Sequence, residues 1–181
     1  RGYRGIFHCK IQEDKMTHQK YPSRLKIFNR KEKEEVEKIL ENQFGIQEIS
    51  GMILQRGEER LFLFQGSMSE KQIYELEQTL PIERIGIYFA KISEDKDGKN
   101  RIRLSIEGTQ FFSNQINKNI FELSGEQVED WMKGGELQIA TGKKDFLIMK
   151  YKDNFLGTGK ASENKISNFI PKNRRLRNKN N

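Results

Sequence analysis

The stretch that decides the fold runs from Phe155-Leu-Gly-Thr-Gly-Lys160 to Lys165-Ile-Ser-Asn-Phe-Ile-Pro-Lys-Asn-Arg-Arg-Leu-Arg177. Glycines within an apolar strand pattern indicate a bulge or a close approach of two backbones. Pro171 disfavours a helix at Ile170 and stiffens the exit from the last strand. The pattern therefore predicts two strands separated by a turn, followed by a basic segment that leaves the sheet at a fixed angle.

The ends of the chain are basic and its middle is acidic. The 181 residues carry a net charge of +7, yet residues 160–181 alone carry +6 and residues 1–31 carry +7, which leaves −6 for residues 32–159. A basic edge on a small β domain is typical of proteins that bind nucleic acid. The alternative is a frayed, solvated C-terminus.

Length and composition favour an intracellular protein with one domain of ordinary size or two small ones. Cys9 is the single cysteine, so an internal disulfide is excluded and a reducing, cytoplasmic location is expected. No apolar run reaches the about 18 residues of a membrane span, so no membrane association is expected.

Three capping signals predict three helices. Each consists of Asn or Ser followed three residues later by Glu or Gln. Val36, Ile39, Leu40 and Phe44 would form the apolar stripe of the first helix, and Ile73, Leu76 and Leu80 that of the second. Gly45, Pro81 and Gly134-Gly135 are placed to end the three helices. The capping pairs are Asn29 with Glu32, Ser69 with Gln72, and Ser124 with Gln127.

Alternating β-formers predict a series of short strands. In residues 84–92 the alternating apolar positions are Ile85, Ile87 and Phe89, and in residues 101–106 both Arg101 and Arg103 fall on the face opposite the apolar one. The residues between 12 and 23 are polar and indicate a linker. The expected strands cover residues 6–11, 25–28, 52–55, 60–65, 84–92, 101–106, 120–123, 136–140, 145–151, 155–161 and 165–169.

The sequence offers no convincing catalytic or metal-binding constellation. Cys9, between His8 and Lys10, could be a nucleophile, but a buried structural cysteine is the favoured interpretation. His8, Cys9 and His18 lack the spacing of a zinc site. Gly157-Thr-Gly-Lys160 does not continue into Ser or Thr and a helix, as a phosphate loop requires. We expect no catalytic residue, metal or cofactor in this chain.

Basic residues around the last strand are the candidate nucleic-acid ligands. Arginine can bind phosphate with two hydrogen bonds and stack on bases. Arg101 and Arg103 offer a second basic surface, although solvated strand residues are an equally good interpretation of that pair. Trp131 shares a helical face with Val128 and is expected in the core. The C-terminal candidates are Lys160, Lys165, Lys172, Arg174, Arg175 and Arg177.

Several motifs together resemble a PUA domain of the type appended to Sun-type (Fmu-type) RNA cytosine-C5 methyltransferases and their archaeal relatives. The most specific is Leu-Gly-x-Gly-Lys followed by Asn-x-x-Pro-Lys-x-Arg-Arg. Residues 25–112 are similar to the module that precedes this domain. The motifs are Asn119-Ile-Phe-Glu-Leu-Ser, Trp131-Met-Lys-Gly-Gly-Glu-Leu, Phe146-Leu-Ile-Met-Lys-Tyr, Phe155-Leu-Gly-Thr-Gly-Lys and Ile166-Ser-Asn-Phe-Ile-Pro-Lys-Asn-Arg-Arg.

The resemblance implies an α+β fold, in which a small N-terminal α/β sheet module precedes a PUA-like β pseudobarrel with one principal helix. Residues 1–14 would be the last strand of a methyltransferase domain that this sequence otherwise lacks. A linker at 15–22 would precede the pre-PUA module at 23–114, the RNA-binding domain at 115–177 and a tail at 178–181.

The resemblance also implies a function. A PUA domain of this kind binds structured RNA, here rRNA or tRNA, and positions it for cytosine-C5 methylation or in ribosome biogenesis. S-adenosylmethionine would be needed only by an upstream catalytic domain. We expect a monomer; the alternative function is a protein-interaction adaptor in a ribosome-assembly complex. The implied basic groove edge is Lys160, Lys172, Arg174 and Arg175, with Gly134, Gly135, Gly157 and Gly159 as structural glycines.

Overall fold

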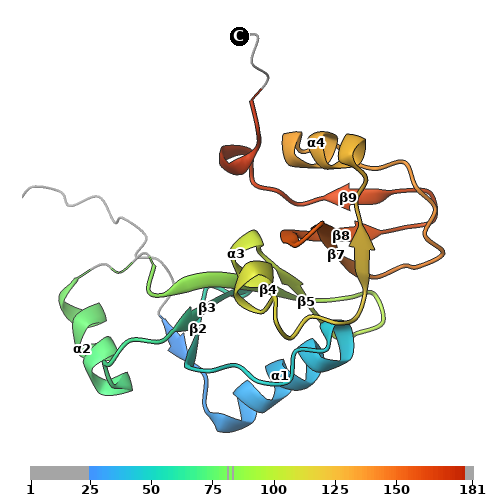
Figure 1. Ribbon diagram of the computed structural model, residues 1–181. Coiled ribbons are helices and arrows are strands. Elements are labelled where there is room, and N and C mark those ends of the chain that lie inside the picture. Colours follow the sequence, from blue (N-terminus) through green and yellow to red (C-terminus); the bar gives the residue numbers. More distant parts are fainter. Residues whose placement is uncertain (1–24, 81, 83, 178–181) are drawn as a thin grey trace, which may run out of the picture.

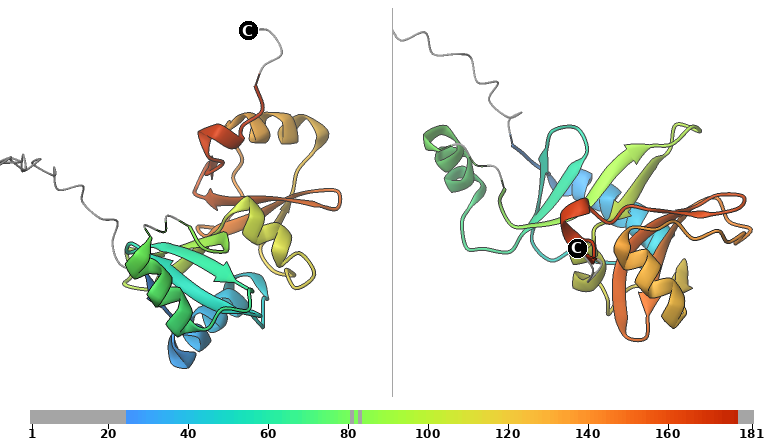
Figure 2. Two further views of the ribbon diagram at one scale, coloured as in Figure 1. Left: turned by 90° about the vertical axis from the view of Figure 1, so that its left-hand side faces the viewer. Right: turned by 90° about the horizontal axis from the view of Figure 1, so that it is seen from above.

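The computed structural model describes residues 25–177, apart from positions 81 and 83. Two sheets, both mainly antiparallel, lie side by side with a short helix between them (Figures 1 and 2). The expected α+β class is confirmed. The predictions made for residues 1–24, including the strand at 6–11, the linker, His8, Cys9 and His18, lie outside the described residues, as does the tail at 178–181.

The first sheet is a five-stranded antiparallel meander in the order β1-β2-β3-β4-β5. The expected hairpin between residues 52–55 and 60–65 is confirmed, and Gly57 at its turn has φ +67°. The strands are β1 (Lys26–Ile27), β2 (Met52–Arg56), β3 (Arg60–Phe64), β4 (Ile87–Glu94) and β5 (Asn100–Leu104).

Helix α1 (Arg30–Phe44) forms as its capping signal predicts. The Asn29 side chain accepts from the Glu32 backbone, the Glu32 carboxylate accepts from the Asn29 backbone, and Gly45 ends the helix in the left-handed region at φ +82°. Near its end Gln43 is buried, and its amide exchanges two hydrogen bonds with the backbone of Ile102 on β5. The helix therefore protects the edge of the sheet as well as burying an apolar face.

Helix α2 (Glu70–Thr79) also begins at its predicted cap, Ser69, but its apolar stripe is shorter than expected. Ile73 is fully buried, whereas Leu80 is 54% exposed, so its assignment to the stripe was wrong. Leu80 is the C-cap and has an extended backbone, which turns its side chain away from the face that a continued helix would present.

The strand expected at 84–92 begins only at Ile87, because Gly86 makes a turn with φ +75°. A bulge opposite Leu61 and Phe62 inserts Phe89 as an extra residue in β4, which breaks the alternation that placed Ile87 and Phe89 on one face. Phe89 is fully buried and Ile87 is 39% exposed.

The strand expected at 101–106 ends at Leu104, and a helix that the sequence analysis missed follows it. In α3 (Ile106–Phe111), the Ser105 hydroxyl caps the helix by accepting from Gly108 N at 2.9 Å, and it donates to the Tyr88 carbonyl at 2.8 Å. Ile106 is therefore a helical residue, and α3 is fixed against β4.

The second sheet, in the order β6-β7-β8-β9, has one parallel pair, β6 with β7, and is otherwise antiparallel. Helix α4 (Gly125–Lys133) follows β6 at the predicted cap, Ser124, and buries Trp131 completely, as expected. The indole N–H of Trp131 donates to the Leu156 carbonyl at 3.1 Å. The strands are β6 (Ile120–Glu122), β7 (Phe146–Tyr151), β8 (Asn154–Ala161) and β9 (Ile166–Asn168).

The strand expected at 136–140 was wrong. Leu137 makes a single bridge with Ile166, with the two backbones exchanging hydrogen bonds. The Ile139 backbone N–H then turns back to the Leu137 carbonyl at 3.0 Å instead of continuing the ladder. This local turn ends the pairing after one bridge.

The two sheets share a hydrophobic core and are joined by buried hydrogen bonds. Phe146, Ile148 and Phe155 of the second sheet belong to the core cluster that contains the buried residues of α1 and the first sheet. The Thr158 hydroxyl donates to the Leu104 carbonyl at 2.9 Å, and the Thr109 hydroxyl accepts from Gly157 N at 3.2 Å. The relative position of the sheets is therefore held by packing as well as by the chain.

None of the helices in the described part of the chain combines the length and the apolar character that crossing a bilayer requires.

Candidate nucleic-acid interface

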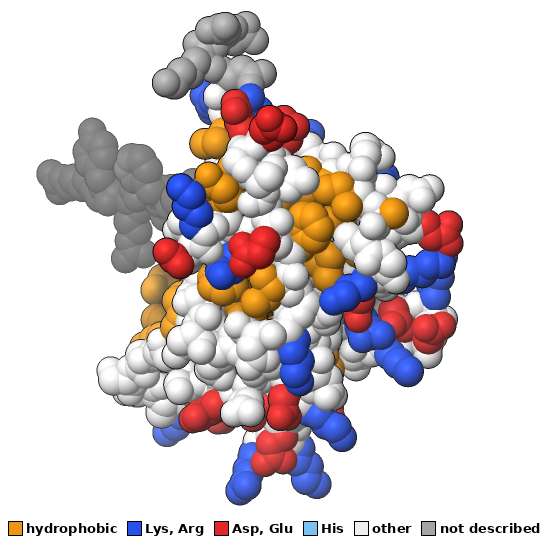
Figure 3. All heavy atoms as spheres, turned by 45° about the vertical axis from the view of Figure 1, so that its right-hand side comes forward, with side chains coloured by type: hydrophobic (Ala, Val, Ile, Leu, Met, Phe, Trp, Pro, Cys, Tyr) orange, Lys and Arg blue, Asp and Glu red, His pale blue; other side chains and the backbone are white. Residues whose placement is uncertain are grey.

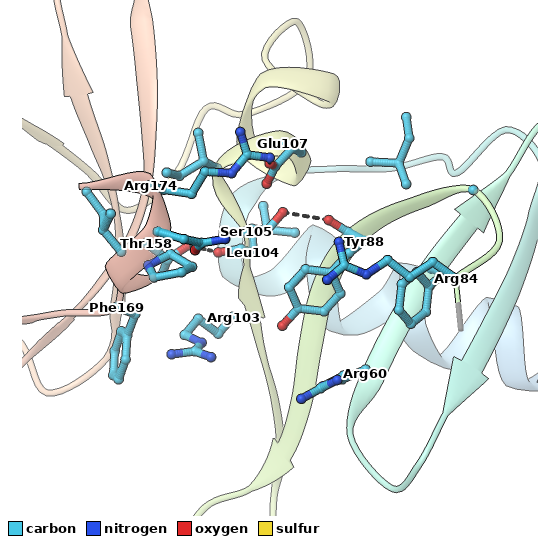
Figure 4. A pocket seen from close by; sticks show the side chains of 18 residues that line it. Arg60, Arg84, Tyr88, Arg103, Leu104, Ser105, Glu107, Thr158, Phe169 and Arg174 are labelled. Carbon is cyan, nitrogen blue, oxygen red and sulfur yellow. Dashed lines mark hydrogen bonds and ion pairs between the residues drawn. The ribbon is translucent and has the colours of Figure 1, made fainter. Parts of the chain in front are cut away.

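A groove of about 560 Å³ lies between the two sheets. Its walls come from β3, β4 and β5 on one side, and from β8 and the segment after β9 on the other, with the start of α3 between them (Figure 4). Its volume is within the about 300–1,000 Å³ range of typical ligand sites. The shared core beneath it fixes the distance between its walls.

The groove lining is strongly basic. Four arginines line it, Arg60, Arg84, Arg103 and Arg174, against one carboxylate, Glu107. The side chains of Arg60, Arg84 and Arg103 have no ion-pair partner within the described residues, whereas Arg174 pairs with Glu107. We call these first three residues the groove arginines.

Phe169 and Arg103 form a cation–π pair in the lining of the groove. The Arg103 guanidinium carbon lies 4.2 Å from the centroid of the Phe169 ring, and this ring in turn meets Phe146 edge to face at 6.2 Å. Phe169 follows β9, is 38% exposed and belongs to the lining of the groove. The two residues come from different sheets, so their contact depends on both.

Tyr88 on β4 supplies a second aromatic wall. Its ring packs on Phe62 at 5.5 Å between centroids, and its hydroxyl points into the space between Arg60 and Arg103 (Figure 4). The groove lining contains neither histidine nor cysteine, and the described residues hold no group of three or more His, Cys, Asp or Glu side chains suited to a metal ion. The chemistry on offer is the binding of anions and of planar π-faces.

The C-terminal basic segment is docked on the second sheet and α4 as far as Leu176, so the alternative of a frayed end is wrong for residues 171–176. After Pro171 the chain forms a short 3-10 helix, η1 (Lys172–Arg174). Leu176 N donates to the Met132 carbonyl of α4 at 2.9 Å, and Arg175 Nε donates to the Ile170 carbonyl at 3.0 Å. Arg174 is thereby held at the groove.

Gly134 makes the docking of this segment possible. It is the C-cap of α4 at φ +92°, and a Cβ placed there would lie 2.3 Å from Arg175 Nε. Gly159 has a similar role in β8, because a Cβ there would lie 2.5 Å from Ile166 Cγ2 and 2.9 Å from the Trp131 ring. These approaches agree with the expectation that the glycines allow close packing. At Gly135 and Gly157 a Cβ would meet Asp130 O and Ile106 Cγ1, respectively.

Besides Arg174, two more of the candidate basic residues are neutralised by acidic neighbours. Arg101 Nε lies 3.0 Å from Asp95 and its Nη1 3.3 Å from Asp145, and Lys165 Nζ lies 2.7 Å from Glu136. Hydrogen bonds from Lys165 and then Ser167 hold the pKa of the Glu136 carboxyl below its usual value. Neither Arg101 nor Lys165 lines the groove.

The remaining candidates are distributed around the groove. Arg103 and Arg174 line it, and Lys160 lies over the Phe146 ring, with its Nζ 4.6 Å from the ring centroid. Lys172 and Arg177 are exposed, do not line the groove and have no ion-pair partner in the described chain. The structure thus brings Arg103 together with the C-terminal segment, and separates it from Arg101 two residues earlier.

Three lysines elsewhere on or next to the second sheet and α4 are paired with carboxylates. Lys133, Lys144 and Lys150 lie 2.6, 2.7 and 3.0 Å from Glu129, Glu163 and Glu122, respectively. We call Lys133, Lys144 and Lys150 the paired lysines. On the face shown in Figure 3, blue and red side chains stand next to one another around exposed apolar patches.

Four groove residues were not among the candidates predicted from the sequence: Arg60, Arg84, Tyr88 and Phe169. No spacing relates them, because they come from separate strands and a post-strand segment that the fold brings together. The one local signal was Arg84 close before Tyr88, a cation and an aromatic ahead of a bulged strand, and this motif is common on exposed strands.

Similarity to known proteins agrees with this architecture. The family model described as "Methyltransferase RsmF PUA domain" matches residues 118–176. The chain is 31% identical over 135 residues to "Ribosomal RNA small subunit methyltransferase F" of Psychromonas ingrahamii, an alignment that covers 72% of this chain and 26% of the relative. This alignment is too long for residues 118–181 alone, so it extends into the upstream module. The chain spans about a quarter of the length of this relative, and its residues 118–176 form a PUA domain of the type found in Sun-type methyltransferases.

Proposed function

We propose that this chain is an RNA-binding region that holds ribosomal RNA for methylation by a catalytic domain of the same protein. The PUA domain and the relative that is named as a ribosomal RNA methyltransferase support the proposal. The proposed reaction is cytosine-C5 methylation, in which S-adenosylmethionine would bind to an upstream catalytic domain and the present chain would supply no catalytic group. The proposed setting is ribosome biogenesis in the cytoplasm.

The observation that carries the proposal is the groove, with three guanidinium groups that have no carboxylate partner among the described residues. Unpaired arginines held at one place leave a local positive potential, which attracts a phosphate backbone. Because Arg60 and Arg103 stand on strands of the first sheet and Arg84 lies just before β4, these residues can contact an RNA backbone without a change of fold. The PUA domain provides the opposite wall, with Arg174 paired to Glu107.

A salt-titrated binding assay tests this function. Fluorescence anisotropy would compare a labelled small-subunit rRNA fragment containing a helical junction, a tRNA, and a DNA duplex of similar length. With about four phosphate contacts at about 0.7 to 0.9 per contact, the log–log slope against salt should be about −3 for RNA. RNA binding with no salt dependence, or equal binding to the DNA duplex, would overturn the proposal; preference for the tRNA would change the target class.

A protein-interaction adaptor is the second candidate, and the acidic body favours it. Residues 32–159 carry a charge of −6, and Leu80 and Ile87 are exposed apolar side chains near the first sheet. A protein interface built on apolar area would respond weakly to salt. The same titration therefore separates the two candidates.

A further inference from the structure

We propose that the groove between the two sheets is a subsite for an unpaired nucleotide, with its base stacked on the Arg103 guanidinium and its phosphates on Arg60 and Arg84. The inference rests on the proposed function and adds to it which part of the RNA is selected. Binding of RNA in general requires only positive charge, whereas this subsite requires a planar surface at a fixed position.

The Arg103–Phe169 pair supplies that planar surface. The guanidinium carbon of Arg103 lies over the Phe169 ring, 4.2 Å from its centroid, and Phe146 meets the Phe169 ring edge to face at 6.2 Å. A guanidinium that contacts a ring on one side can take a second planar group on its other side, and exposed bases in RNA stack on arginine planes. Because Arg103 has no carboxylate partner among the described residues, its charge also remains available to the nucleotide.

The groove arginines lie where the sugar-phosphate backbone of a stacked nucleotide would pass. Arg60 stands at the start of β3, directly across from Lys91 on β4, and Arg84 precedes the turn at Gly86. Figure 4 shows both side chains extending toward the space beside Tyr88 and Arg103. A phosphate on either side of the base would then meet one guanidinium.

Polar groups are available for the edge of the base. The Tyr88 hydroxyl points into the groove, and the exposed amide of Asn173 lines it from η1. Each can donate or accept a hydrogen bond. The Ser105 hydroxyl is already engaged with the Tyr88 carbonyl and Gly108 N.

The shape of the groove favours an unpaired nucleotide over a duplex. In an A-form duplex the bases are stacked inside the helix, and proteins contact its phosphates and 2′-hydroxyls. The groove has about 560 Å³, enough for an inserted nucleotide, and its aromatic walls would have no function against a duplex exterior. Loops, bulges and junctions present bases that can leave the stack.

The test uses the full 181-residue chain and two RNA hairpins with the same stem, one of which carries a single bulged 4-thiouridine. Anisotropy should show about a 10-fold preference for the bulged hairpin, since stacking of one base is energetically significant. Near-ultraviolet cross-linking followed by peptide mass spectrometry should place the 4-thiouridine on residues 84–91 or 166–174.

Arg103→Lys separates stacking from charge, because lysine keeps the positive charge but lacks the planar group. The variant should lose the preference for the bulged hairpin while its affinity for the paired hairpin changes little. Arg30→Lys, on the exposed start of α1, is the matched control and should keep the preference. Phe169→Leu, which keeps an apolar side chain but removes the ring, should also reduce the preference.

An unchanged preference in Arg103→Lys would overturn the inference. So would cross-links confined to other segments in a chain that still binds RNA, and this result would leave the proposed function standing. A chain that binds neither hairpin would overturn both.

Discussion

The groove and the paired lysines carry positive charge in two different ways. Each of the three paired lysines has a carboxylate within 3.0 Å, so its charge is largely balanced at its own position. The groove arginines have no such partner among the described residues and converge on one cavity. The positive charge available to a polyanion therefore depends on whether each basic side chain is ion-paired and whether the side chains converge, and much less on the net charge of a segment.

The C-terminal segment illustrates the difference within a few residues. Residues 160–181 carry +6 in the sequence, yet Lys165 is paired with Glu136 and Arg174 with Glu107. Arg175 is used to dock the segment on the end of α4. Much of this charge therefore builds and positions one wall of the groove.

The largest expected effect is a loss of stability of the PUA domain, which contains the paired lysines and one wall of the groove. Trp131→Ala should lower the free energy of unfolding by about 3–5 kcal/mol, because it leaves a cavity at a fully buried position. Chemical denaturation measures this loss. Trp131→Phe is the control and should lose less, chiefly the hydrogen bond to Leu156; near wild-type stability of Trp131→Ala would contradict the core assignment.

A second substitution releases the groove wall at its anchor. Gly134→Ala should destabilise the fold by about 1–3 kcal/mol, because alanine at φ +92° is strained and its Cβ meets Arg175. Gly142→Ala is the matched control, since Gly142 has φ +70° with open space around it. Limited proteolysis should cut the C-terminal segment faster only in Gly134→Ala; equal behaviour of the two variants would refute the role of Arg175 docking.

A third substitution loosens the junction of the sheets without changing any charge. Thr158→Val removes the hydrogen bond to the Leu104 carbonyl and should cost about 1 kcal/mol. Thr158→Ser keeps the hydroxyl and is the control. The melting temperatures of both variants measure the difference; a serine variant as unstable as the valine variant would show that the methyl packing matters and the hydrogen bond does not.

The smallest effect concerns Arg101, the neutralised counterpart of Arg103. The pKa of the Asp95 carboxyl is held below its usual value, first by the hydrogen bond from the Lys99 backbone and then by Arg101. A lowered folded-state pKa means that this stabilisation is present above the ordinary carboxyl pKa and is lost as pH falls through the folded-state value.

Arg101→Ala should therefore raise the pKa of Asp95 only part of the way to its ordinary value, since the Lys99 contribution remains. A carbon-detected NMR titration of the carboxyl measures this shift. Arg103→Ala should leave it unchanged, and a shift there would show that the two arginines are not electrostatically separate.

Local signals predicted most of the secondary structure. The capping residues Asn29, Ser69 and Ser124 each begin a helix, because satisfying the first backbone N–H groups is a local matter. The glycines of β8 pack as expected because their missing Cβ is visible in the sequence.

The errors arose where tertiary contacts or a bulge decide. Gly108 allows α3 to approach the Phe89 carbonyl, where a Cβ would lie only 2.1 Å away, and the short pattern after Leu104 gave no sign of this packing. The bulge at Phe89 moved Ile87 to the exposed side. Both depend on residues distant in the sequence.

Only part of the candidate site could be predicted from the sequence, because tertiary contacts bring its residues together. Arg103 and Arg174 were among the predicted ligands, but nothing in the sequence separated Arg103 from Arg101 or joined either to Arg60 and Arg84. Carboxylates that neutralise Arg101 come from residues 6 and 44 positions away. Ion pairs of this kind follow from sheet register and cannot be predicted from the spacing of residues in the sequence.

The most direct test of the account compares equal charge removed from the two regions. The triple variant Arg60→Gln/Arg84→Gln/Arg103→Gln would be titrated with salt against the structured rRNA fragment beside Lys133→Gln/Lys144→Gln/Lys150→Gln. We expect the groove variant to bind the RNA more weakly, with a log–log salt slope that is less negative by about 2 to 3. The lysine variant should keep an affinity and a salt slope close to those of the wild type. Equal losses in the two variants would contradict it, because net charge and not the groove would then determine binding.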